Sequence, residues 1–143
     1  MAVGCSVLMA QSAGAICVVM PLEHHLSNPE VTAVFSGTVQ DVSFASAGQT
    51  ATFQVSRVWK GRVGRRTVLY NGNSRMMQDE RIELQSGRTY LVIAHRQSPD
   101  ERAEFHVPSA SRDALGVSGC DLYLFDSQYA RDVLGDAPGY PPR

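Results

Sequence analysis

The stretch FQVSRVWKG, residues 53–61, decides the fold. Apolar and polar side chains alternate in its first half, as in a strand with one buried face. Val58 then breaks the alternation, and this break predicts a β-bulge near Ser56 and Arg57. We therefore predict a strand over 50–59 that bends before it reaches the next glycine turn.

Similar β-runs precede and follow this stretch. Residues 31–44 carry Gly37 in mid-strand, which fits a strand that bends around a small barrel. Residues 90–95 are apolar on both faces, so we predict a central strand that is covered on both sides. Further strands are predicted at 66–70 and 103–107. About five short strands with tight turns are typical of a small closed barrel or a small sandwich.

The end of the chain predicts a helix and a tail. We expect a short amphipathic helix over 127–134 that is N-capped by Asp126 and stopped by a glycine. It is expected to dock through Tyr129 and Val133. Residues 137–143 are rich in proline and predict a flexible tail.

The N-terminal segment has the composition of a leader. The first charged residue is Glu23, and residues 1–15 form a short apolar run that ends in an A-x-A cleavage signal at 13–15. Cleavage there predicts a secreted, periplasmic or cell-envelope protein whose single domain spans 16–136 and begins at Ile16. No positive residue precedes the run, so a buried N-terminal helix or strand is the alternative. In both cases the segment is too short for a stable membrane span.

The three cysteines are Cys5, Cys17 and Cys120. Removal of the leader leaves two of them, and an even number in an exported chain suggests one disulfide bond. Two unpaired buried thiols are the alternative.

The sequence predicts neither catalysis nor a cofactor or metal. The histidines are not accompanied by an HExxH or CxxC motif, and no G-x-S-x-G elbow is present. The formal net charge of −1 argues against binding to nucleic acid through electrostatics. Exposed or hydrogen-bonded imidazoles are therefore expected at all four histidines, which are His24, His25, His95 and His106.

Trp59, Lys60 and Arg62 are the candidate partner contact, because they lie where a strand ends in a turn and an exposed tryptophan can anchor a partner. In the alternative interpretation Trp59 closes one end of the barrel and Lys60 is solvated. Three further arginines make this turn basic; they are Arg57, Arg65 and Arg66.

The motifs AVFSG, F-V-RVWKG and G--YLVIA occur in this order between two cysteines. This arrangement resembles the bacterial proteins similar to tissue inhibitors of metalloproteinases, which share the netrin-like OB barrel. The similarity covers residues 17–134. It implies a mainly all-β, five-stranded OB-fold-like barrel with a short C-terminal helix, and a disulfide between Cys17 and Cys120.

The resemblance also implies a non-catalytic protein-interaction or inhibitor-like module, whose partner is a protease or an envelope component. A structural domain without a specific ligand is the alternative. Inhibitors of this family coordinate the protease zinc through the α-amine and carbonyl of an N-terminal cysteine. Here Ile16 would precede Cys17, so we expect that mechanism to fail.

Overall fold

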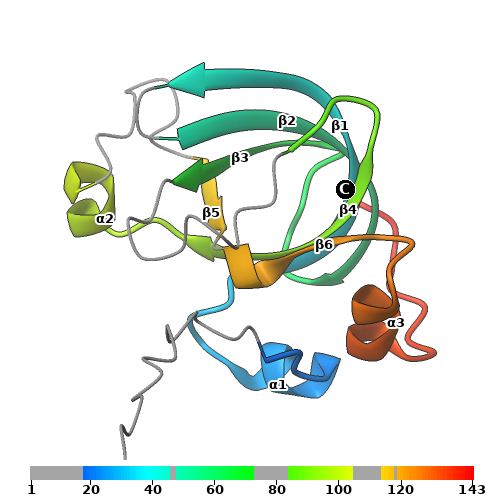
Figure 1. Cartoon of the computed structure of the whole chain (residues 1–143). Coiled ribbons are helices and arrows are strands. Elements are labelled where there is room, and N and C mark those ends of the chain that lie inside the picture. Colours follow the sequence, from blue (N-terminus) through cyan, green and yellow to red (C-terminus); the bar gives the residue numbers. More distant parts are fainter. Residues whose placement is uncertain (1–17, 46–47, 73–83, 105–113, 118) are drawn as a thin grey trace, which may run out of the picture.

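Figure 1 shows the computed structural model, which describes residues 18–45, 48–72, 84–104, 114–117 and 119–143. Strands dominate, and short helices lie before, between and after them. In chain order the elements are α1 (Leu22–Ser27), β1 (Ala33–Ala45), β2 (Gly48–Lys60), β3 (Arg66–Gly72), β4 (Thr89–Arg96), α2 (Pro99–Glu104), β5 (Leu115–Val117), the 3-10 helix η3 (Gly119–Asp121), β6 (Leu122–Leu124) and α3 (Gln128–Leu134).

Five strands close into a barrel in the order β1-β2-β3-β5-β4, and pairing of β4 with β1 completes the ring. The contact between β3 and β5 is parallel, whereas the other pairings are antiparallel. β6 is an additional strand that pairs with the first half of β4. The predicted fold class, a small five-stranded OB-fold-like barrel with a short C-terminal helix, is confirmed.

The inside of the barrel is a packed apolar core. Phe35, Phe53 and Tyr90 are almost fully buried there, and their rings meet edge to face. The ring centroids lie 5.9 Å apart for Phe35 and Phe53 and 6.3 Å apart for Phe53 and Tyr90. Edge-to-face packing of this kind contributes beyond the burial of area alone. Phe53 lies on the buried face that the alternation at the start of residues 53–61 predicted.

The bulge predicted in β2 is confirmed. The pairing of β1 with β2 steps from Ser36 opposite Arg57 to Gly37 opposite Val55, so that Ser56 is the extra residue. Gly37 lies at this step, and a Cβ atom there would come within 2.9 Å of the Gln54 carbonyl oxygen. The bend in the barrel therefore requires a glycine at this position.

A second apolar cluster, called the outer cluster here, covers the other face of β4. Leu91 and Ile93 of β4 contribute to it, together with Leu22 of α1 and Val133 of α3. Figure 1 shows α1 and α3 outside the strands, whereas α2 lies at another end of the barrel. β4 is thus covered on both sides, as predicted. The outer cluster also includes Val34, Tyr123 and Ala130, with Val19, Val31, Trp59, Leu134 and Ala137 packed against it.

The fifth barrel strand differs from the prediction. At the start of the strand predicted over 103–107, Ala103 is exposed and belongs to α2. Residues 105–107 lie outside the described residues. The barrel is closed instead by β5, where a Cβ atom on Gly116 would come within 2.7 Å of His95 Nε2. Three residues with a central glycine fit between β3 and β4, but they are too few to give a strand pattern in the sequence.

The C-terminal helix is present, but two of its predicted details are wrong. Ser127 is the N-cap in place of Asp126, and its Oγ accepts a hydrogen bond from the Ala130 N–H at 3.2 Å. Tyr129 is 60% exposed, and Ala130 docks the helix together with Val133. Ala130 and Val133 are three positions apart and therefore lie on the same, buried face of the helix. The glycine stop is confirmed at Gly135.

Residues 137–143 pair with β2, in contrast to the expected flexible tail. Tyr140 exchanges two backbone hydrogen bonds with Val58, at 2.7 and 2.8 Å, and the Arg143 N–H donates to the Val63 carbonyl at 3.0 Å. The reason is that β3 pairs with β2 only as far as Gln54. The tail therefore satisfies backbone groups of β2 that β3 leaves without a partner.

Candidate functional site

Trp59 lies beneath the C-terminal tail. Its indole Nε1 donates a hydrogen bond to the Ala137 carbonyl at 2.9 Å, and its half-buried ring packs against the outer cluster. The backbone of the tail passes so close that a Cβ atom on Gly139 would lie 3.0 Å from Trp59 Cε2. The indole therefore holds the tail on the barrel.

Lys60 is also engaged within the chain. Its Nζ donates to the backbone carbonyls of His25 at 2.9 Å and of Asn28 at 2.7 Å, at the C-terminal end of α1. Carbonyl groups at a helix C-terminus lack partners within the helix and carry a partial negative charge. Lys60 therefore attaches α1 to the end of β2, which is a role that the alternative of a merely solvated lysine did not include.

Of the three residues in the candidate partner contact, Arg62 alone is exposed to solvent. It is exposed, as are Arg65 and Arg66, and these three residues are called the arginine turn below. In the part of the chain that the structure describes, their side chains make no hydrogen bond or ion pair. Arg57 differs, because its guanidinium donates to the carbonyls of Pro138 at 3.1 Å and Gly139 at 3.4 Å.

Cys120 lies half-buried in η3, where its carbonyl accepts a hydrogen bond from the Tyr123 hydroxyl at 2.7 Å. Cys5 and Cys17 lie outside the described residues. The pairing of Cys17 with Cys120 therefore stays a prediction.

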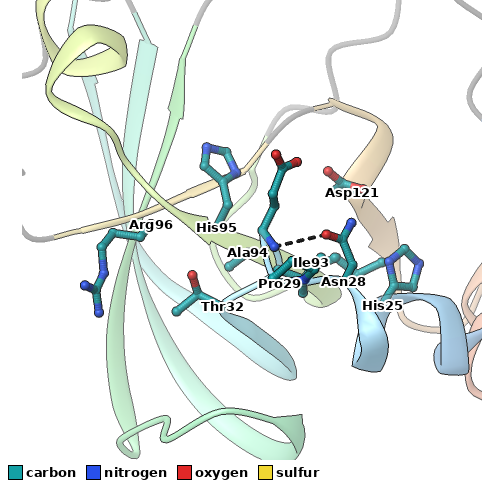
Figure 2. A pocket seen from close by; sticks show the side chains of 11 residues that line it. His25, Asn28, Pro29, Thr32, Ile93, Ala94, His95, Arg96 and Asp121 are labelled. Carbon is teal, nitrogen blue, oxygen red and sulfur yellow. Dashed lines mark hydrogen bonds between the residues drawn. The ribbon is translucent and has the colours of Figure 1, made fainter.

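A polar pocket of about 830 Å³ lies between α1, the segment that follows it, β4 and η3 (Figure 2). His25 of α1, His95 of β4 and Asp121 of η3 are among the residues that line it, and Figure 2 shows their side chains apart from one another. The Asn28 Oδ1 atom accepts a hydrogen bond from the Glu30 N–H at 3.0 Å and shapes its rim. The pocket is lined by His25, Asn28, Pro29, Glu30, Val31, Thr32, Ile93, Ala94, His95, Arg96 and Asp121.

His25 is the most unusual group in this pocket. The residue is only 6% exposed, and its Nε2 atom has no hydrogen-bond partner among the described residues. Burial lowers the pKa of His25 below its ordinary value of 6.5, and the nearby charges of His24 and Lys60 act in the same direction. The negative charge of Asp121 opposes this shift but does not reverse it. His25 is therefore a neutral imidazole in the folded protein at pH 7.

We expect the stability of the protein to fall as the pH drops below 6.5 because of His25. The unfolded chain takes up a proton at this residue near pH 6.5, whereas the folded chain does so only at lower pH. The loss of stability therefore begins near the pKa of His25 in the unfolded chain and ends at the lower pKa of His25 in the folded chain. Urea unfolding at several pH values measures it.

His25→Gln should remove this part of the pH dependence. His24→Gln is the matched control, because His24 is the exposed neighbour in the same helix. An equal slope in the wild type and in His25→Gln would contradict the assignment.

Sequence reasoning did not predict this pocket. The one available signal was the spacing of Leu22 and His25, which places both on one face of a helix and so separates His25 from His24. The contributions of His95 and Asp121 depend on tertiary contacts. His106 lies outside the described residues. Within the described ranges, no group of three or more histidine, cysteine, aspartate or glutamate residues is arranged to hold a metal ion, and no helix is long and apolar enough to cross a membrane.

The comparisons with known proteins add no relative. No protein-family profile matches the sequence, and a search of curated proteins finds no match.

Proposed function

We propose that this chain is an exported, non-catalytic protein-interaction or inhibitor-like module built on a netrin-like OB barrel. In this proposal residues 1–15 are a signal peptide, and Cys17 and Cys120 form a disulfide bond. The partner is a protease or an envelope component.

The observation that carries the proposal is the attachment of the N-terminal segment to the outside of a filled barrel. Phe35, Phe53 and Tyr90 occupy the interior, whereas Lys60 and the outer cluster hold α1 against the barrel surface. In the netrin-like family the N-terminal segment lies against the barrel in the same way. Recognition by such a molecule depends on its outer surface.

Affinity capture tests the proposal. The mature protein is immobilised and exposed to the native extracellular or periplasmic fraction, and eluted proteins are identified by mass spectrometry. The expected result is one partner that soluble competitor protein displaces. Recovery of no displaceable partner would favour the alternative, a secreted or envelope-associated structural domain without a specific ligand.

We also predict that the mature protein does not inhibit a zinc protease through the active-site metal. Cleavage after residue 15 leaves Ile16 ahead of Cys17, and the α-amine is then displaced from the position that coordinates zinc. N-terminal sequencing of the native protein determines the first residue of the mature chain. Assays with a purified zinc protease determine whether that chain inhibits it. Tight inhibition that disappears on acetylation of the N-terminus would refute the prediction and would indicate processing at Cys17 itself.

A further inference from the structure

We infer that the arginine turn, formed by Arg62, Arg65 and Arg66, is the surface through which this protein binds an acidic, carboxylate-rich region of its protein partner. This inference rests on the proposed function, because it names the chemistry of the partner that the module binds.

Charge is segregated along the chain. The protein as a whole has a formal net charge of −1, yet no acidic residue occurs between Asp41 and Asp79. This interval contains all of β2 and β3 and the turn between them. The cations in it are Arg57, Lys60, Arg62, Arg65, Arg66 and Arg75. The described part of this interval, residues 42–45 and 48–72, therefore carries cations and no acidic residue, which favours association with a surface of opposite charge.

Two of these cations, Arg57 and Lys60, are bound within the chain and are not available to a partner. Lys60 binds carbonyls of α1, and Arg57 binds carbonyls of the C-terminal tail. The arginine turn has neither kind of partner in the described part of the chain, and its three side chains are exposed. Guanidinium groups without internal partners retain their donors for an external carboxylate, which they bind in a bidentate geometry.

The backbone of the arginine turn is held in place. Val63 is 3% exposed and anchors the turn in the core. The Arg65 N–H donates to the Arg143 carbonyl at 3.1 Å, and the Arg65 carbonyl accepts from the Val55 N–H at 2.8 Å. Gly61 begins the turn with φ at 85°, a conformation that favours glycine.

A fixed backbone limits the positions of the three guanidinium groups before the partner arrives. Less conformational entropy is then lost on binding. The planar guanidinium fork matches a carboxylate in a bidentate geometry, so these observations favour a carboxylate-rich protein region as the ligand.

A charge-matched pair of variants tests the inference. Arg62→Glu with Arg66→Glu reverses two charges in the arginine turn, whereas Arg88→Glu with Arg131→Glu makes the same change in net charge on exposed residues of the loop before β4 and of α3. Circular dichroism and thermal melts establish that both variants fold. The probes are a fluorescein-labelled peptide of glutamate and aspartate and, for comparison, labelled dextran sulfate, both followed by fluorescence anisotropy.

We expect the wild type to bind the acidic peptide, and the turn variant to bind it about tenfold more weakly, since each reversed charge replaces an attraction by a repulsion. The control variant should lose much less affinity. Equal losses in both variants would show a general effect of net charge and would overturn the inference. Preferential binding to dextran sulfate would also overturn it, because the surface would then suit a polysaccharide.

The same variants separate this inference from the proposed function. Capture of the native partner by the wild type and the control, but not by the turn variant, is the expected result. If the turn variant also captures the partner, the inference is wrong and the proposed function stands. If the wild type captures no specific partner, the proposed function itself fails.

Discussion

Loss of the proposed disulfide bond between Cys17 and Cys120 is expected to lower the free energy of unfolding by about 2–4 kcal/mol and the melting temperature by several degrees. The proposed bond closes a loop that contains the whole barrel, so its chief effect is on the unfolded chain. The barrel core does not depend on it, and the fold should survive reduction.

The contacts of the described residues support this pairing. Val19, two residues after Cys17, packs against the outer cluster, which also contains Tyr123, three residues after Cys120. Asp121 in turn acts on the pKa of His25 in α1. The described start of the chain and the segment that follows η3 therefore contribute to the same cluster. The proposed bond requires the Cα atoms of Cys17 and Cys120 to approach within about 7 Å.

Intact mass after alkylation, with and without reductant, is the decisive measurement, in a chain that carries Cys5→Ser if the leader is retained. The single variants Cys17→Ser and Cys120→Ser and the double variant should lose equal stability, since each removes the same bond. Two alkylated thiols in the unreduced, denatured protein would refute the bond and would weaken the netrin-like assignment.

Replacement of Lys60 by methionine should release α1 from the barrel and cost about 2 kcal/mol. The substitution keeps most of the apolar stem but removes the two charge-assisted hydrogen bonds to the carbonyls of His25 and Asn28. Hydrogen bonds to charged groups contribute about 1.5–3 kcal/mol each, and the half-buried position of Lys60 reduces this value.

Hydrogen exchange measures the effect locally. The amides of α1 should lose protection in Lys60→Met, whereas the amides of β4 should keep theirs, because the inner core holds that strand independently. Arg62→Met is the control, since Arg62 is exposed two residues away on the same turn. Unchanged exchange in α1 of the Lys60→Met variant would show that the outer cluster alone holds the helix.

Much of the barrel could be predicted from the sequence because its signals are local. Alternation of side chains predicted β1 and β2, a run that is apolar on both faces predicted β4, and the broken alternation at Val58 located the bulge. The fifth strand could not be found in this way, because Leu115–Val117 is too short to show a period and gains its hydrogen bonds only from β3 and β4. The prediction at 103–107 followed an alternation that α2 interrupts at Ala103.

The candidate site likewise combines features that the sequence predicted with features that depend on tertiary contacts. From the sequence, Trp59, Lys60 and Arg62 were grouped into one candidate contact because all three lie at the end of one strand. In the structure their roles differ, because different segments of the chain contact each of them. The tail covers Trp59, the end of α1 reaches Lys60, and Arg62 has neither neighbour. The pocket around His25 was not predicted, because its walls come from segments about ninety residues apart in the chain.

The sequence by itself therefore determined the class of fold, the positions of the long strands and the basic character of the β2–β3 turn. These properties depend on side-chain periodicity and composition, which each segment carries alone. Only the tertiary structure decided which cations are available, where His25 is buried and how residues 137–143 lie along β2. Those properties depend on hydrogen-bond partners that distant segments bring to the outer face of the barrel and to the part of β2 that β3 does not pair.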